Sequence, residues 1–174
     1  AMYNMIFYAN TVIEGVMEAR ADVTTDSREQ LLAEAYCLRA FVHFDLINLY
    51  AKWYDPATAA TDKAVPLSLK IDIGQSFIPT TVEKVYEQVF ADLQEAEKYM
   101  QVEQQTGAYL YRFSKKALKA FQARVYLYHQ DWKQAQETAE SLLAACPLED
   151  LTTTEAQPWT YTSKEAILAL ETVS

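Results

Sequence analysis

The chain has 174 residues, of which 51% are apolar, and it carries a formal net charge of −9. A chain of this length can bury roughly 70% of its unfolded surface in one core. Its three glycines and five prolines argue against an all-β sandwich or barrel, because those folds need many tight turns. The excess of acidic over basic residues argues against a protein that binds nucleic acid or anionic membranes nonspecifically.

Several classes of site lack the residues that they need. No glycine-rich phosphate-binding motif occurs, so no nucleotide cofactor is implied. The two cysteines, Cys37 and Cys146, form no C-x-x-C pair and only two histidines accompany them, so we expect no metal site. Cys37 lies among apolar residues and is predicted to be a buried thiol.

Apolar residues recur every three or four positions along most of the chain, which predicts helices. The first helix is predicted over about residues 2–20 and the second over 27–50, where Ser27 and Gln30 form a capping box. The second helix is apolar around most of its circumference, which is typical of a central helix. Within it, we expect Arg39 to pair with an acid on a neighbouring helix and to have no catalytic role.

A long connection follows, from residue 51 to about residue 79. Connections of this length inside a compact domain are usually functional or disordered. A third helix is then predicted to begin at a capping box formed by Thr80 and Glu83 and to reach about Met100.

Two more helices are predicted, one capped by Ser114 and the other by Asp131, with a short turn that makes them antiparallel neighbours. The segment of about residues 114–147 fits the 34-residue tetratricopeptide unit. In this unit, the small residues Ala135 and Ala139 lie where the two helices approach each other. A generic antiparallel hairpin is the alternative. The predicted fold class is therefore all-α, with tetratricopeptide-like antiparallel helix pairs and long inserted loops.

The periodicity fades after Pro147, and the apolar run at residues 166–170 fits a strand or a buried helix equally well. The chain ends four residues later, without a closing element. We therefore expect residues 1–174 to form one helical domain that is a truncated portion of a larger protein.

No catalytic constellation stands out, and we expect the protein not to be an enzyme. His43 and Asp45 are two positions apart on a helix and so point to different faces. Glu149 and Asp150 fit a solvated loop pair. Neither G-x-S-x-G nor H-E-x-x-H is present.

A binding site is a better interpretation, and its candidate ligand-binding residues are Trp53, Tyr54 and Asp55, at the start of the long connection. Aromatic faces can stack on the C–H faces of sugar rings, while a carboxylate bonds their hydroxyls. The alternative is that Trp53 and Tyr54 pack the loop onto the helices. Tyr109 and Tyr111, in the other irregular connection, are weaker candidates of the same kind.

Five blocks of sequence, in the same order along most of the chain, resemble the SusD/RagB-type family of nutrient-binding proteins. The helix containing E-A-Y-C-L-R-A is similar to the E-A-x-x-L-R-A helix of that family, and A-V-P-L to its short vPl segment. The blocks are residues 33–50, 64–67, 81–96, 112–132 and 163–168.

The resemblance implies an α-helical, tetratricopeptide-containing lipoprotein on the outer face of a Gram-negative outer membrane. Such proteins capture oligosaccharides or peptides and cover TonB-dependent transporters. In that family, loops after the second helix can contribute to the ligand surface. The resemblance also implies that this chain is the amino-terminal helical part of a larger protein, with the lipoprotein signal and the lipid-bearing cysteine expected upstream of it. The competing hypothesis is a tetratricopeptide adaptor that binds another protein, and a helical-toroid enzyme would need acids from outside this chain.

Overall fold

The structure is a computed structural model that describes residues 2–20, 27–72, 74, 77–146, 148, 152, 163 and 165–170. It divides into two compact units, one formed by Ala1–Met100 with Tyr128–Gln130 and the other by Gln101–Leu127 with Asp131–Ser174. The predicted all-α class is confirmed, with one small addition, a two-stranded sheet. None of the described helices is long and apolar enough to span a bilayer.

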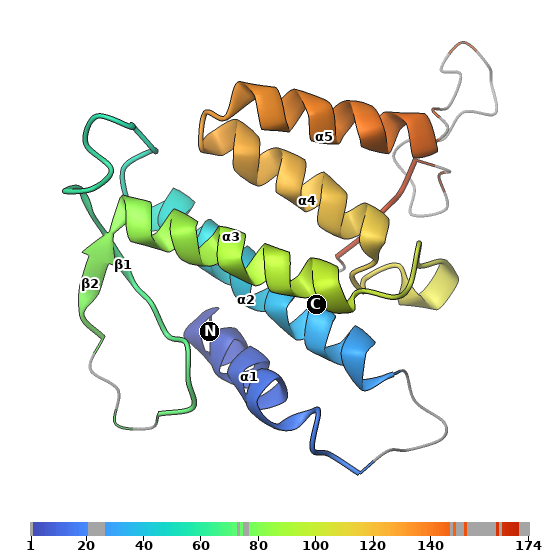
Figure 1. Ribbon diagram of the computed structural model, residues 1–174, viewed down its shortest axis with the longest axis horizontal. Coiled ribbons are helices and arrows are strands. Elements are labelled where there is room, and N and C mark those ends of the chain that lie inside the picture. Colours follow the sequence, from blue (N-terminus) through green and yellow to red (C-terminus); the bar gives the residue numbers. More distant parts are fainter. Residues whose placement is uncertain are drawn as a thin grey trace. The chain divides into compact units, whose positions relative to one another are not determined.

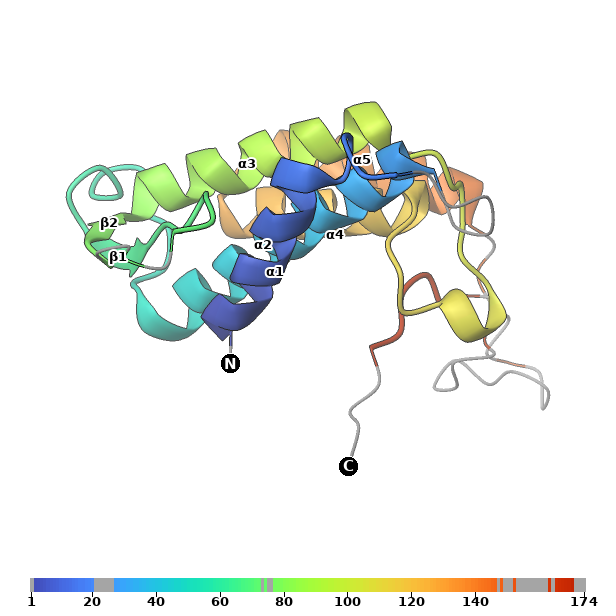
Figure 2. The same cartoon turned by 90° about the horizontal axis from the view of Figure 1, so that it is seen from below.

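The first unit is built around α2 (Arg28–Tyr50), which contacts both α1 (Met2–Gly15) and α3 (Val82–Tyr99) (Figure 1; Figure 2). Small fully buried residues on α2 let the neighbouring helices approach closely, namely Ala33, Cys37 and Ala40. The predicted central position of this helix is therefore confirmed. Cys37 is a free, buried thiol whose pKa is raised by burial, as expected.

Helix starts follow the local capping chemistry in most places. The Ser27 hydroxyl accepts a hydrogen bond from the backbone N–H of Gln30 at 3.1 Å. Helix α1, however, ends at Gly15 and not at about Arg20. Beyond Gly15, Glu18 N–H bonds to Gly15 O at 3.2 Å, which is a tighter turn than the helical ladder.

The start of α3 differs from the prediction by one residue, because Thr81 and not Thr80 is its cap. Thr80 belongs to β2 (Pro79–Thr81), which pairs antiparallel with β1 (Lys63–Pro66). The first two backbone N–H groups of α3 bond to the loop between α2 and β1: Val82 N–H donates to Asp62 O and Glu83 N–H to Ala59 O. This long-range pairing positions the helix start, and a local motif cannot show it.

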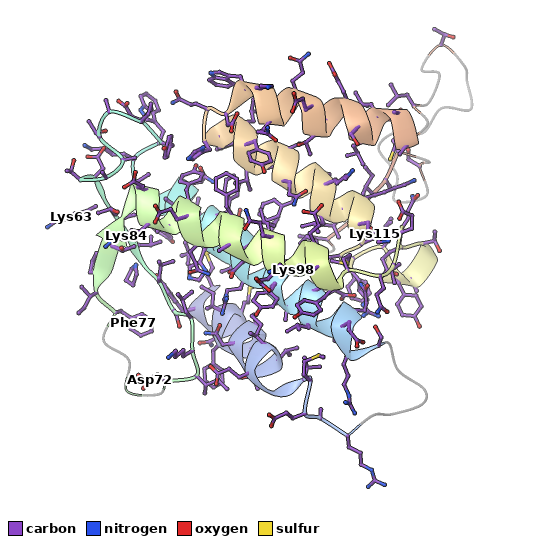
Figure 3. The ribbon with its side chains drawn as sticks, viewed as in Figure 1. Lys63, Asp72, Phe77, Lys84, Lys98 and Lys115 are labelled. Atoms are coloured by element: carbon purple, nitrogen blue, oxygen red, sulfur yellow. The ribbon has the colours of Figure 1, made fainter. Side chains whose placement is uncertain are left out.

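Part of the connection between β1 and β2 is held against the helices of the first unit; Figure 3 labels Asp72 and Phe77, farther along the same connection. Side chains of α1 and α2 hold its backbone at residues 68–71. The Asn10 amide donates to Ser68 O and Lys70 O, each at 3.2 Å, and the Glu14 carboxylate accepts from Ile71 N–H at 2.8 Å. We call residues 68–71 the strap. The predicted long connection is thus ordered by side-chain hydrogen bonds over this segment.

The second unit holds η1 (Gly107–Tyr109), most of α4 (Lys115–Tyr128) and α5 (Trp132–Ala145). Ser114 and Asp131 cap α4 and α5, as predicted. The two helices lie side by side and are bridged by Lys119 Nζ, which donates to Ser141 Oγ at 3.2 Å (Figure 1).

The carboxy-terminal expectations are tested only in part. Residues 166–170 form neither a helix nor a strand, and their backbone is tied to Leu110 O through Ala169 N–H at 3.1 Å. Pro147, Glu149 and Asp150 lie outside the described residues.

Candidate functional site

The loop directly after α2 presents Trp53 to solvent, with 85% of the residue exposed. An indole offers a large apolar face and one N–H donor, which is the chemistry that stacking ligands use. Trp53 therefore stands where the sequence placed a candidate ligand-binding residue, with its face open.

The loop that carries Trp53 is held by its own polar groups. Asp55 O accepts from Thr58 N–H at 3.0 Å and from Ala59 N–H at 2.7 Å, and the Asp55 carboxylate accepts from Ala57 N–H at 2.9 Å. This is an Asx turn, in which the side chain substitutes for a backbone acceptor. Asp55 thus builds the loop, whatever else its carboxylate contacts.

A second set of bonds closes the same loop. Lys52 Nζ donates to one Asp62 carboxylate oxygen at 2.5 Å, and the Thr58 hydroxyl donates to the other at 2.7 Å. These bonds hold the pKa of Asp62 below its usual value. The loop around Trp53 is consequently preorganised and does not depend on a ligand to become ordered.

Tyr54 faces the protein. Its ring lies 5.1 Å from that of Tyr86 and 4.0 Å from the imidazole of His129, measured between ring centroids. Its carbonyl accepts from Gln130 Nε2 at 2.7 Å, and burial raises its pKa. Of the three predicted residues, Trp53 faces solvent, Tyr54 packs the loop onto the first unit, and Asp55 forms the turn.

Sequence reasoning missed the group that receives Tyr54. We call it the Tyr54 cluster, and its members are Phe44, Tyr54, Tyr86, Phe90, Tyr128 and His129. Burial, followed by the neighbouring Tyr128 and Tyr54, raises the pKa of Tyr86 to about 12. The adjacent aromatic residues Tyr128 and His129 at a predicted turn were the available signal, since turns are usually polar.

A pocket lies where the start of α1 meets the end of α2 and β1. It is an apolar pocket of about 480 Å³ lined by Met2, Tyr3, Leu46, Tyr50, Val65 and Pro66. The Tyr3 hydroxyl donates to Pro66 O at 2.9 Å. The lining offers mainly apolar contact, and its polar side-chain groups are the phenol hydroxyls of Tyr3 and Tyr50.

The remaining predicted residues have structural partners. Arg39 pairs with Asp92 of α3, which confirms the expected ion pair. His43 is fully buried, its Nδ1 is 3.0 Å from Arg39 O, and Ser68 N–H donates to its Nε2 at 3.4 Å. Tyr109 and Tyr111, in the second unit, are both more than half exposed.

Within the described residues, no group of three or more His, Cys, Asp or Glu side chains could hold a metal ion.

Comparison with known proteins identifies the family. A family model described as "Starch-binding associating with outer membrane" matches residues 1–127. The chain belongs to the SusD-like family. The resemblance seen in the sequence is therefore confirmed.

Individual members agree. The SusD-like chain is 32% identical over 147 residues to SusD-like protein P38 of Formosa agariphila, covering 82% of this chain and 25% of that protein. A SusD superfamily protein from Bacteroides fragilis superposes with a TM-score of 0.78 at 25% identity, over 99% of this chain and 39% of that one.

A SusD-like carbohydrate-binding protein from Bacteroides vulgatus superposes with a TM-score of 0.77 at 20% identity, over 96% of this chain and 35% of that one. The SusD-like chain thus spans between a quarter and two fifths of the length of these three relatives.

Proposed function

We propose that this SusD-like chain belongs to a non-catalytic cell-surface protein that binds a glycan and delivers it to a TonB-dependent outer-membrane transporter. The observation that carries the glycan-binding part is Trp53, an indole exposed to 85% on a loop that its own hydrogen bonds already order. Ordering a loop before binding lowers the entropy that the ligand must overcome.

The chemistry of the loop suits a sugar. The flat face of Trp53 can stack on the C–H face of a pyranose ring. Asp55, two positions along the chain, has one carboxylate oxygen available beyond the turn bond to Ala57. Tyr54 takes part by anchoring the loop through its ring and its carbonyl. Trp53, Tyr54 and Asp55 thus remain the proposed ligand-binding residues, with different roles.

Relatives support a glycan as the ligand. A laminarin-binding SusD-like protein shares the fold, with a TM-score of 0.68 at 24% identity over 86% of this chain and 30% of that one. The matching family description names starch binding and association with the outer membrane. We accordingly propose an outward-facing position at the outer membrane, held by a lipid anchor outside the described residues.

The glycan-binding proposal predicts that Trp53→Ala weakens the affinity of the intact protein for its oligosaccharide by about tenfold or more, as expected when a stacking aromatic is truncated. Isothermal titration against a panel of oligosaccharides, laminarin fragments and starch fragments included, measures it. Trp132→Ala is the matched control, because Trp132 is also exposed, to 62%, and lies on α5. Equal affinity of the Trp53 and Trp132 variants would contradict the proposed site.

The delivery proposal predicts a stable complex with an outer-membrane transporter. Affinity purification of the tagged intact protein from detergent-solubilised outer membranes, followed by mass spectrometry, should recover a TonB-dependent transporter as the main partner. A wash at high salt should retain it if the interface is large and apolar. Recovery of a different protein as the main stable partner would favour an adaptor instead.

A further inference from the structure

The turn Tyr128–Gln130 holds Tyr54 in two ways. The His129 imidazole lies against the Tyr54 ring, with the ring centroids 4.0 Å apart and the planes inclined by 39°. The next residue, Gln130, donates from Nε2 to the Tyr54 carbonyl at 2.7 Å. Consecutive residues therefore hold both the side chain and the backbone of the residue that directly follows Trp53. All these residues belong to the first unit.

Gln130 occupies a backbone conformation that favours glycine. Its φ is 64°, and among the described residues it is the one non-glycine residue with a positive φ. A side chain in this region costs about 1 kcal/mol relative to glycine. Stability alone would select glycine or asparagine here. The glutamine side chain makes a hydrogen bond to Tyr54 O that glycine could not make.

We infer that Gln130 is a positioning residue for Trp53. The amide of Gln130 holds the carbonyl of Tyr54, and so it sets the direction in which the preceding residue presents its indole. On the far side, the ion pair of Lys52 with Asp62 holds the residue before Trp53. Trp53 is thereby held on both sides while its own side chain stays exposed. The predicted effect on ligand affinity rests on the proposed glycan-binding function, but the effect on the loop does not.

The inference makes a prediction that separates positioning from stability. Gln130→Gly removes the amide and relieves the positive-φ cost, so the melting temperature should stay equal or rise. The loop should nevertheless loosen, and glycan affinity should fall about three- to tenfold because ordering of the loop is then left to the ligand. Gln130→Glu keeps the size of the side chain but places an oxygen against the Tyr54 carbonyl in place of the donor. It should therefore loosen the loop as well.

Two measurements on the intact protein test this. Hydrogen–deuterium exchange with mass spectrometry follows the amides of Ala57, Thr58 and Ala59, which are bonded to Asp55, and isothermal titration follows the oligosaccharide. The control is Gln134→Glu, which adds the same charge four residues away, where the amide of Gln134 donates to Glu137 instead. We expect faster exchange at residues 57–59 in both Gln130 variants and parental exchange in the Gln134 control.

Each outcome decides one claim. Exchange at residues 57–59 that equals the parental rate in both Gln130 variants would overturn the inference. Faster exchange with parental affinity, in a protein whose Trp53→Ala variant has lost binding, would overturn it as well. If Trp53→Ala itself binds the glycan normally, the proposed function fails at this loop, and the exchange data still decide whether Gln130 holds it.

Discussion

Replacing Arg39 with methionine should lower the free energy of unfolding by about 3–5 kcal/mol, because it leaves a buried carboxylate without its partner. Arg39 bonds Asp92 through two parallel hydrogen bonds, Nε to Oδ2 at 2.9 Å and Nη2 to Oδ1 at 2.7 Å. Both side chains are almost fully buried. Such a charge cannot regain its water without opening the contact between α2 and α3.

Arg39 also does more than pair with one acid. Its Nη1 donates to the Asn10 side-chain oxygen at 2.9 Å and to Leu69 O of the strap at 3.2 Å. One guanidinium therefore joins α1, α2, α3 and the strap. Its planar arrangement of donors suits this task, which the ammonium group of a lysine could not reproduce.

Urea unfolding followed by circular dichroism measures the effect. Lys98→Met is the control, because it removes a similar ion pair, with Glu95, at an exposed position on α3, where the change should be too small to resolve. The double variant Arg39→Met with Asp92→Leu should recover much of the loss, since no buried charge is then left unpaired. A single variant as stable as the parent would contradict the role given to Arg39.

Acid should destabilise the protein through His43 before most carboxylates titrate. Burial, opposed by the bond to Arg39 O and aided by the Arg39 charge, lowers the pKa of His43 from its ordinary 6.5 to about 4. The neutral ring fits the site, because Nδ1–H can donate to Arg39 O while Nε2 accepts from Ser68 N–H. A protonated ring would point a second N–H at the Ser68 donor.

The direction of the pH effect follows from the lowered pKa. The unfolded chain takes up a proton on His43 near pH 6.5 and the folded chain does so only near pH 4. The stabilisation is complete above pH 6.5 and is lost as the pH falls from 6.5 to 4, by about 3 kcal/mol in all.

Urea unfolding of the parent and of His43→Gln, at steps between pH 7.5 and pH 4, tests this. The other ionisable groups are the same in both proteins, so the difference between the two curves isolates His43. That difference should shrink as the pH falls from 6.5 to 4. A difference that stays constant across this interval would contradict the assignment of His43 as a buried neutral ring.

Local chemistry was predictable where the determining contacts lie within one turn of helix. Ser27, Ser114 and Asp131 cap the helices that the sequence assigned to them. The cap is Thr81 and not Thr80, because β2 extends to Thr81, which pairs with Lys63 of β1, and α3 starts only at Val82, where the free N–H groups bond to Asp62 O and Ala59 O. Short strands that contain proline carry no clear alternation of polar and apolar residues, so the small sheet left no pattern to read.

The candidate site was predictable as a location but not as an arrangement. The sequence places Trp53, Tyr54 and Asp55 together at the start of a long loop. Outside a helix or strand the residues have no regular period, so the sequence cannot show which side chain faces solvent and which faces the protein. Only the coordinates separate the exposed indole from the packed phenol and the turn-forming carboxylate. The role of Gln130 was beyond sequence reasoning, because 76 positions separate it from Tyr54.

By itself, the sequence determined the all-α class, the order and approximate limits of the five helices, the family, and the need of Arg39 for an acidic partner. The family rests on the resemblance of five sequence blocks. The class, the helices and the partner of Arg39 follow from periodicity, caps and burial of charge, which act over short distances along the chain or on one residue at a time. The tertiary structure decided which acid Arg39 binds, how the strap is held, and which face of the Trp53 loop meets solvent. Those depend on side chains brought together from distant positions, and their contacts exist only once the helices have packed.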